Sequence, residues 1–127
     1  MPRLELKLYS LHITDRCNLQ CHYCYVKKRK KVMNLSLAKR AIDFLSPDLA
    51  EPLIEIGELG LFGGEPLLEW NLIKKIIAYA ETKPNIKKFG VATNGLLLNK
   101  EILEYFIEHN VYPALSIDGI QIAQDRH

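Results

Sequence analysis

Three cysteines lie within eight residues of this chain, at Cys17, Cys21 and Cys24, in the stretch DRCNLQCHYCY. Thiolates bind zinc and iron, and this spacing allows all three to converge on one metal centre. A structural zinc site takes four protein ligands and a closed iron–sulfur cluster takes four cysteines, but the chain has only three cysteines. The sequence therefore predicts a metal centre with one coordination position open to a cofactor or a substrate.

Two histidines near these cysteines offer a way to close the site. His12 precedes the first cysteine, and His22 lies between the second and the third. Imidazole is a common zinc ligand, so a zinc knuckle completed by either histidine is the alternative to an open centre. A structural disulfide fits less well, because an odd number of tightly clustered cysteines in a reducing compartment is typical of metal binding.

The composition is that of an ordinary globular chain. Its 127 residues are 48% apolar and 25% charged, with a formal net charge of +2, which is enough material for one domain with a buried core. No apolar run approaches the length of about 18 residues that a membrane span needs, and Glu5 and Lys7 interrupt the apolar start where a signal peptide would be continuous. We therefore expect a cytoplasmic location and no membrane partner.

The strongest charge feature of the sequence is a basic run at residues 27–31. A docking patch for an acidic peptide or a nucleic acid is one interpretation of such a run. No aromatic residue is interleaved with these basic residues, so we favour a solvated loop and expect no nucleic acid partner.

The elements that position the cysteines follow from the apolar periodicity. Apolar segments bounded by turn residues predict four strands. These strands are expected at residues 6–13, 59–62, 89–92 and 111–117. Residues at helical spacing predict three intervening helices, the first capped by Asn34 or Ser36, the second beginning at Pro66 and the third capped by Asn99. The side chains expected on their buried faces are Leu37, Ala41, Ile42 and Leu45 in the first, Leu68, Leu72, Ile73, Ile76, Ile77 and Ala80 in the second, and Ile102, Leu103, Phe106 and Ile107 in the third.

This alternation of strands and helices predicts one α/β domain with a parallel sheet and right-handed crossovers. In such folds the chemistry gathers at the carboxyl ends of the strands. The four unusual segments of the sequence each follow a predicted strand, so we expect one shared site. They are the cysteine loop at 15–25, the GGEP turn at 63–66, the TNG turn at 93–95 and the SIDG turn at 116–119, within a single domain at 1–127.

The combination of these motifs resembles the radical S-adenosylmethionine (radical SAM) enzyme superfamily. An aromatic residue, Tyr23, stands directly before the third cysteine, and the GGEP, TNG and SIDG turns follow at similar intervals, so that the resemblance runs from about Leu11 to the last residue. The likeness is greatest to the branch that modifies peptides and proteins, which includes anaerobic sulfatase-maturing enzymes and relatives with a C-terminal SPASM domain.

The resemblance implies a fold and two cofactors. The fold would be a partial TIM-type barrel of parallel βα units, with about four of the family's six strands present. Cys17, Cys21 and Cys24 would ligate three irons of a [4Fe–4S] cluster, and the fourth iron would chelate the amino nitrogen and the carboxylate of S-adenosylmethionine. Reduction of the cluster would cleave this cofactor to a 5'-deoxyadenosyl radical, which abstracts hydrogen from a substrate.

The resemblance also gives roles to the glycine-rich turn. The main chain of Gly63 and Gly64 and the carboxylate of Glu65 would face the methionyl ammonium, because exposed carbonyls and a carboxylate are suitable acceptors. We therefore expect Gly64→Val to block S-adenosylmethionine while leaving the cluster in place. Taken alone, the glycines of such turns are equally typical of ordinary chain reversal.

The remaining cofactor contacts come from the other loops. Tyr23 would lie against the adenine, although ordinary loop packing is also open to it. Asn94 and Ser116 would serve the ribose or the methionyl carboxylate, being short hydrogen-bonding side chains at neighbouring strand ends. Asp118 would serve the same pocket or cap its own turn.

The implied partners are a one-electron donor such as flavodoxin or ferredoxin and a peptide or protein substrate. Two residues depart from the peptide-modifying branch, since Ile120 stands where proline is common and Gln124 where histidine is common. With four of six strands, the chain would be a fragment, or would need a C-terminal segment or partner to cover its last strand. The hypothesis of a different class is a non-catalytic zinc-binding or iron–sulfur-binding module.

Overall fold

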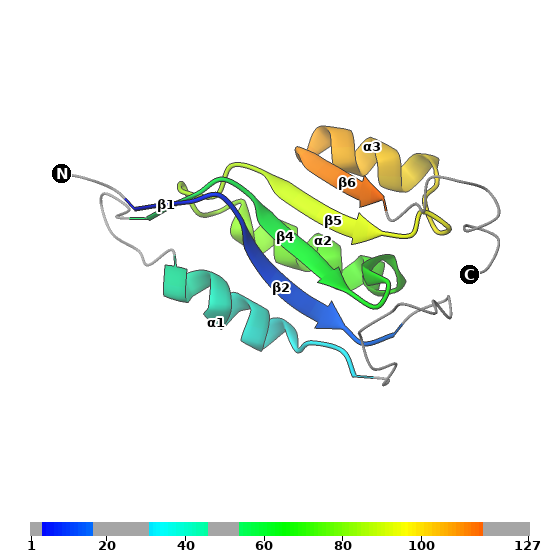
Figure 1. Cartoon of the computed structure of the whole chain (residues 1–127), viewed down its shortest axis with the longest axis horizontal. Coiled ribbons are helices and arrows are strands. Elements are labelled where there is room, and N and C mark those ends of the chain that lie inside the picture. Colours follow the sequence, from blue (N-terminus) through cyan, green and yellow to red (C-terminus); the bar gives the residue numbers. More distant parts are fainter. Residues whose placement is uncertain (1–3, 17–30, 46–53, 116–127) are drawn as a thin grey trace.

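Four parallel strands form the main sheet of the molecule (Figure 1). The computed structural model describes residues 4–16, 31–45 and 54–115. In spatial order, the strands of the main sheet are β2 (Tyr9–Thr14), β4 (Leu59–Gly63), β5 (Phe89–Thr93) and β6 (Val111–Leu115). Because all three ladders are parallel, the carboxyl ends of the four strands lie at one end of the sheet. The predicted parallel α/β fold is confirmed.

Three α-helices pack against one face of this sheet (Figure 1). They are α1 (Leu35–Leu45), α2 (Trp70–Ala80) and α3 (Lys100–Glu108), and a 3₁₀ helix, η1 (Pro66–Glu69), leads into α2. Alternate residues of the strands are buried with apolar residues of all three helices in one core, which includes Leu11, Leu61, Val91, Ile42, Ile76 and Phe106. Among the described residues, no helix is long and apolar enough to cross a membrane, since the longest have 11 residues.

The helix starts agree with the sequence. Asn34 caps α1, because its Oδ1 accepts a hydrogen bond from the Ser36 N–H at 2.7 Å. Asn99 caps α3 by accepting from the Ile102 N–H at 2.9 Å. The predicted second helix begins at Pro66 but makes its first turn as η1 before continuing as α2. Of the side chains expected to be buried, Ile73, Ile76, Ile77 and Ala80 are buried, and Leu68 and Leu72 are partly buried.

Among the side chains whose burial the structure describes, which leaves out Leu45, three predicted to be buried are exposed instead. Leu37 of α1 is 47% exposed, and Leu103 and Ile107 of α3 are 43% and 84% exposed. The core-facing stripe of α1 runs through Ala38 and Ile42, which are buried, whereas Leu37 points about 100° away from Ala38 around the helix axis. A helix on a sheet buries a stripe little more than about 100° wide, so apolar residues beside that stripe stay in solvent.

The strand predicted at residues 6–13 is interrupted, and one strand was missed. At the interruption, the Gly57 N–H donates to the Leu6 carbonyl at 2.7 Å and the Tyr9 N–H donates to the Glu58 carbonyl at 2.9 Å. The segment on one side of this break forms a separate two-stranded parallel sheet. Its strands are β1 (Leu4–Leu6) and β3 (Ile54–Ile56). The break depends on a segment fifty residues away in the sequence, which local periodicity cannot show.

A polar cluster joins α1 to α2 at the surface. The Tyr79 hydroxyl donates a hydrogen bond to Asp43 Oδ1, and Lys83 Nζ lies 3.0 Å from the same oxygen. The hydrogen bonds from Tyr79 and from Lys83 hold the pKa of Asp43 below its usual value. In turn, the hydrogen bond to Asp43 raises the pKa of the Tyr79 phenol.

Candidate functional site

The predicted site residues that the structure describes follow the carboxyl ends of β4 and β5, which lie at the same end of the main sheet (Figure 1). Gly63 ends β4, with Gly64 and Glu65 directly after it, and Asn94 follows the neighbouring strand β5. The remaining predicted residues lie outside the described residues, so their roles stay predictions. These are Cys17, Cys21, Tyr23, Cys24, Ser116 and Asp118.

Glu65 ties the end of β4 to the end of β5 through its carboxylate. The side chain is fully buried. Its Oε1 accepts hydrogen bonds from the Thr93 hydroxyl and the Asn94 N–H, each at 2.7 Å, and its Oε2 accepts from the Leu67 N–H at 3.0 Å. The bond to Leu67 also caps η1. A carboxylate removed from water needs such donors, and here three protein groups supply them.

Thr93 belongs to this site, although sequence reasoning did not assign it a role. Its side chain is buried, and its Oγ1 both donates to Glu65 and accepts from the Gly95 N–H at 3.1 Å. A signal was present in the sequence. A threonine at an inward-facing position at the end of a buried strand needs a hydrogen-bond partner, and an acidic residue at the end of the next strand can provide it.

Gly63 and Gly64 allow the GGEP turn to lie against the end of β2. A Cβ atom on Gly63 would stand 2.2 Å from the Thr14 carbonyl oxygen, and one on Gly64 would stand 2.2 Å from that of Arg16. Hydrogen bonds use this close approach, since the Gly64 N–H donates to Thr14 O at 2.9 Å and the Glu65 N–H donates to Arg16 O at 2.6 Å. Gly63 also has a φ of 156°, which residues with side chains rarely adopt. Close contacts with the main chain of residues 14–16 thus explain why both positions are occupied by glycine.

The cysteine-containing segment leaves and rejoins the described fold at one place. The Asp15 N–H donates to the Lys31 carbonyl at 2.8 Å, and the Met33 N–H donates to the Ile13 carbonyl at 2.7 Å. An antiparallel bridge lies between these two bonds. The residues on either side of segment 17–30 are therefore held together at the carboxyl end of β2, next to the GGEP turn.

His12, a candidate ligand of the zinc alternative, is held by two neighbours. Its Nε2 forms a hydrogen bond of 2.8 Å with Asp15 Oδ1, and its ring makes an edge contact with Phe62 at 5.0 Å between centroids. A carboxylate on one ring nitrogen is common when the other nitrogen binds zinc, so this geometry leaves His12 compatible with that alternative. Within the described ranges no three His, Cys, Asp or Glu side chains gather as a metal-ligand set, and the three cysteines and His22 lie outside these ranges.

A shallow hollow of about 230 Å³ lies on the face of the sheet opposite the helices. Its floor includes Gly60 and Gly90, which are paired neighbours in β4 and β5. Because glycine has no side chain, these two positions leave room for Leu8 and Glu58. A Cβ on Gly60 would stand 3.2 Å from Leu8 Cδ1, and a Cβ on Gly90 would stand 2.7 Å from Glu58 Oε2. A largely apolar hollow below polar strand ends is a common setting for a small-molecule site.

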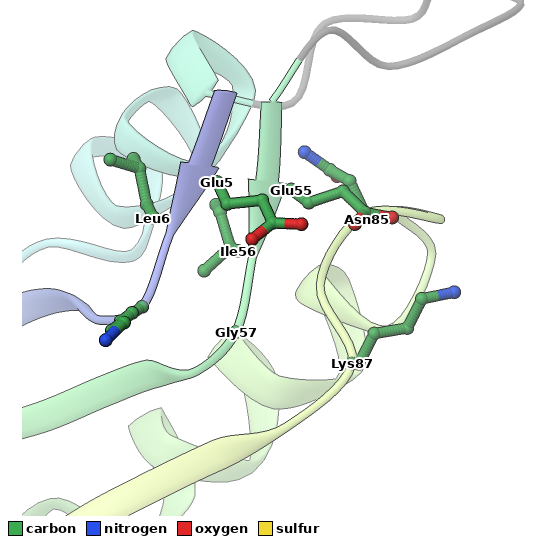
Figure 2. A pocket seen from close by; sticks show the side chains of 8 residues that line it. Glu5, Leu6, Glu55, Ile56, Gly57, Asn85 and Lys87 are labelled. Carbon is green, nitrogen blue, oxygen red and sulfur yellow. The ribbon is translucent and has the colours of Figure 1, made fainter. Parts of the chain in front are cut away.

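Another hollow, of about 320 Å³, lies at the opposite end of the strands (Figure 2). It is lined by residues of β1 and β3 and by the segment before β5, including Glu5, Glu55, Asn85 and Lys87. Glu5 and Glu55 are directly opposite each other in the ladder. This hollow is at the end of the strands that carries none of the motif turns, and we do not assign it to the site.

Comparison with known proteins agrees with the fold. Residues 11–123 match the Radical SAM superfamily. The chain is 39% identical over 121 residues to an uncharacterized protein of Methanocaldococcus jannaschii, an alignment that covers 92% of this chain and 40% of that protein. It is 36% identical over 123 residues to the GTP 3',8-cyclase of a Synechocystis species, covering 91% of this chain and 35% of the cyclase.

A solved structure shows the same fold. Native anSMEcpe with bound AdoMet matches 98% of this chain and 35% of that chain, with a TM-score of 0.75 and 18% sequence identity. The chain spans 40% or less of the length of these three proteins. Because the family match extends over most of the chain and the parallel sheet agrees with it, the chain belongs to the radical SAM superfamily, whose members are enzymes that use a [4Fe–4S] cluster and S-adenosylmethionine.

Proposed function

We propose that this chain is the cofactor-binding part of a radical SAM enzyme core, with Cys17, Cys21 and Cys24 as the ligands of a [4Fe–4S] cluster. The observation that carries the proposal is the 2.6 Å hydrogen bond from the Glu65 N–H to the carbonyl of Arg16, the residue before Cys17. It attaches the turn expected to bind S-adenosylmethionine to the segment expected to bind the cluster. The proposal requires these two segments to be adjacent.

The donor set suits an iron–sulfur cluster with one open iron. Three thiolates from one short loop can ligate three irons, and the chain has no fourth cysteine. When bound and reduced, the cluster would supply the electron that cleaves S-adenosylmethionine to the 5'-deoxyadenosyl radical, which abstracts hydrogen from the substrate. The protein would supply ligation, orientation and exclusion of water.

The contacts to S-adenosylmethionine would come from the carboxyl ends of the strands. We assign the methionyl ammonium to main-chain carbonyls of residues 63–65, because the Glu65 carboxylate already accepts three hydrogen bonds. Asn94 and Ser116 would contact the ribose or the methionyl carboxylate, and Tyr23 the adenine. The hollow over Gly60 and Gly90 would then receive part of the substrate.

For the substrate we propose a peptide or protein, as in the branch whose motifs this sequence resembles. A nucleotide is the second candidate, because a relative 36% identical over 123 residues is a GTP 3',8-cyclase. The sequence departs from the peptide-modifying pattern at Ile120 and Gln124. Both substrate classes are therefore included in the test below.

The proposed chemistry sets conditions on partners and location. Reduction of the cluster needs a one-electron donor such as flavodoxin or ferredoxin. Cysteine thiolates stay reduced in the cytoplasm, which is the location we propose. A further C-terminal segment or a partner would pair with the outer edge of β6 and complete the sheet.

Anaerobic reconstitution with iron and sulfide tests the cofactor assignment. We expect a brown protein whose EPR signal, after reduction, changes when S-adenosylmethionine is added. Alanine at any one of Cys17, Cys21 and Cys24 should abolish the cluster. A colourless protein that takes up zinc instead would support the metal-binding module, and full iron content in one of the alanine variants would exclude the three-ligand assignment.

The substrate class has a separate test on the reconstituted protein. With reductant and S-adenosylmethionine present, the true substrate should increase the formation of 5'-deoxyadenosine. Stimulation by candidate peptides and not by GTP would support peptide modification. Stimulation by GTP alone would replace it with the nucleotide reaction.

A further inference from the structure

Arg16 directly precedes Cys17 in the chain, and described residues hold three of its polar groups. Its N–H donates to Thr14 Oγ1 at 3.0 Å, and its carbonyl oxygen accepts from the Glu65 N–H at 2.6 Å. Its guanidinium Nη1 donates to Glu69 Oε1 at 3.0 Å and lies 3.4 Å from Oε2. Two of these contacts therefore connect Arg16 to the GGEP turn and the η1 helix that continues from it.

The carboxylate of Glu69 binds Arg16 instead of capping the helix that it precedes. It stands at the cap position of α2, where a side chain commonly accepts a hydrogen bond from the first turn, but it makes no such cap bond. Its side chain is only 8% exposed, against 45% for that of Arg16. A carboxylate so shielded from water needs a strong partner, and the guanidinium of Arg16 supplies one.

The contact between Arg16 and Glu69 restricts the orientation of the arginine side chain as well as its distance from Glu69. A guanidinium is planar and donates along defined directions, so its contact with a shielded carboxylate limits how the arginine can turn. The main-chain bond to Glu65 adds a second point of attachment on the same structural element. Arg16 cannot then shift relative to residues 63–69 without breaking one of these contacts.

We propose that Arg16 and Glu69 are positioning residues that hold Cys17, the first cluster ligand, at a set place relative to the main chain of residues 63–65. This inference rests on the proposed function, since it concerns the cluster and S-adenosylmethionine at that place. The three cysteines would still ligate the cluster if the pair were broken. S-adenosylmethionine has to reach both the cluster and the turn, so its binding would weaken.

Charge-removing variants test the pair in the whole reconstituted chain. Arg16→Gln and Glu69→Gln should each keep wild-type iron content and bind S-adenosylmethionine about tenfold more weakly, as read from the change in the cluster EPR signal. The double variant should lose no more than either single variant, because both changes break the same pair. The charge swap Arg16→Glu with Glu69→Arg should recover part of the affinity.

A matched control separates positioning from general charge effects and from stability. Glu104→Gln removes an exposed pair with Lys100, which are 3.8 Å apart on α3, and should leave binding unchanged. If Arg16→Gln fails to fold, Glu69→Gln alone carries the test, because it breaks the same pair from the other side and should weaken binding to the same extent. Wild-type affinity in the pair variants, or a fall in thermal midpoint alone, overturns the inference. A wild-type chain that binds no iron would instead overturn the proposed function.

Discussion

One buried carboxylate, that of Glu65, joins three segments at the carboxyl end of the sheet. Its hydrogen bonds reach the end of β5 through Thr93 and Asn94, and the start of η1 through Leu67. A side chain with these bonds contributes to the fold whether or not a ligand is bound. Substitutions at Glu65 must therefore be measured for stability before they are interpreted as cofactor contacts.

We predict that Glu65→Gln lowers the free energy of unfolding by about 3 kcal/mol. The amide puts a donor where the protein already presents three donors, so at least one buried group loses its partner. Denaturant unfolding of the metal-free chain measures this effect. Glu104→Gln, at an exposed position of α3, is the control and should change stability by less than about 0.5 kcal/mol. Equal stabilities for the two variants would contradict the role given to Glu65.

Gly64 leads to a prediction that differs from the one based on sequence. The sequence predicts that a side chain at this position blocks S-adenosylmethionine and spares the cluster. In the structure, any Cβ at Gly64 would stand 2.2 Å from the Arg16 carbonyl oxygen, next to Cys17. We therefore expect Gly64→Ala to lower both the thermal midpoint and the iron content.

Gly95 provides the control for that variant. It has a φ of 87°, so Gly95→Ala should cost about 1 kcal/mol of backbone strain. Its Cβ would meet only ordinary contacts, at 3.4 Å from Leu115 Cδ2, and iron content should stay at the wild-type level. Full iron content in Gly64→Ala would contradict this prediction, because it would show that residues 14–16 can move away from the new methyl group without loss of the cluster.

At the scale of elements, the contact between α1 and α2 should depend on pH through Asp43. Hydrogen bonds from Tyr79 and from Lys83 lower the pKa of Asp43 in the folded state. A lowered folded-state pKa stabilises the protein at pH values above the unfolded value, and this stability is lost as pH falls through the folded value. The thermal midpoint of the wild type should therefore fall more steeply than that of Asp43→Asn between about pH 5 and pH 2. Parallel curves for the two proteins would exclude this contribution.

The helix faces can be tested with two isoleucines. Ile76 of α2 is fully buried, whereas Ile107 of α3 is exposed although the sequence predicted it to be buried. We expect Ile76→Ala to lower the free energy of unfolding by about 3 kcal/mol and Ile107→Ala by less than about 0.5 kcal/mol. Denaturant unfolding measures both. A large loss in Ile107→Ala would mean that this side of α3 is covered in solution.

Sequence periodicity predicted the elements well where the pattern is local. Asn34 and Asn99 were identified as caps because their amides act within one turn of their own positions. The interruption between β1 and β2 was missed because it depends on the Gly57 N–H and the Glu58 carbonyl, which lie in the break between β3 and β4. The exposure of Leu103 was missed for a similar reason, since it depends on how α3 lies on the sheet.

At the scale of the whole molecule, β6 is one of the two outer strands of the described sheet, with β2 at the other edge. Among the described strands, β6 pairs only with β5. Ile107, Tyr112 and Leu115 are exposed around it, and a hollow of about 310 Å³ lies between α3 and β6. Unpaired strand edges beside apolar side chains favour association with other chains.

We predict that the 127-residue chain associates as its concentration rises and that Leu115→Lys reduces this association. A charge beside the edge disfavours pairing with another strand. Light scattering over a concentration series measures the effect. Phe44→Lys, on the exposed side of α1, removes an equally apolar side chain at a different place and should leave association unchanged. A monomer at every concentration would contradict the prediction.

The site as a whole was predicted only in part. The sequence placed the GGEP and TNG turns at one end of the sheet, because parallel strands end there together. It did not show that Thr93 bonds to Glu65 or that Arg16 bonds to Glu69, since these contacts depend on the register between β2, β4 and β5. Register is set by packing over the whole sheet, which a single motif does not encode.

The contact between Arg16 and Glu69 joins residues that are 53 positions apart. During synthesis, the three cysteines are made before β4 and the GGEP turn. The contacts of residues 14–16 with residues 63–69 close a long loop, and such closure comes after local structure has formed. We therefore expect productive cluster insertion to follow the docking of β4 beside β2, because iron that reached the cysteines earlier would find no framework around them.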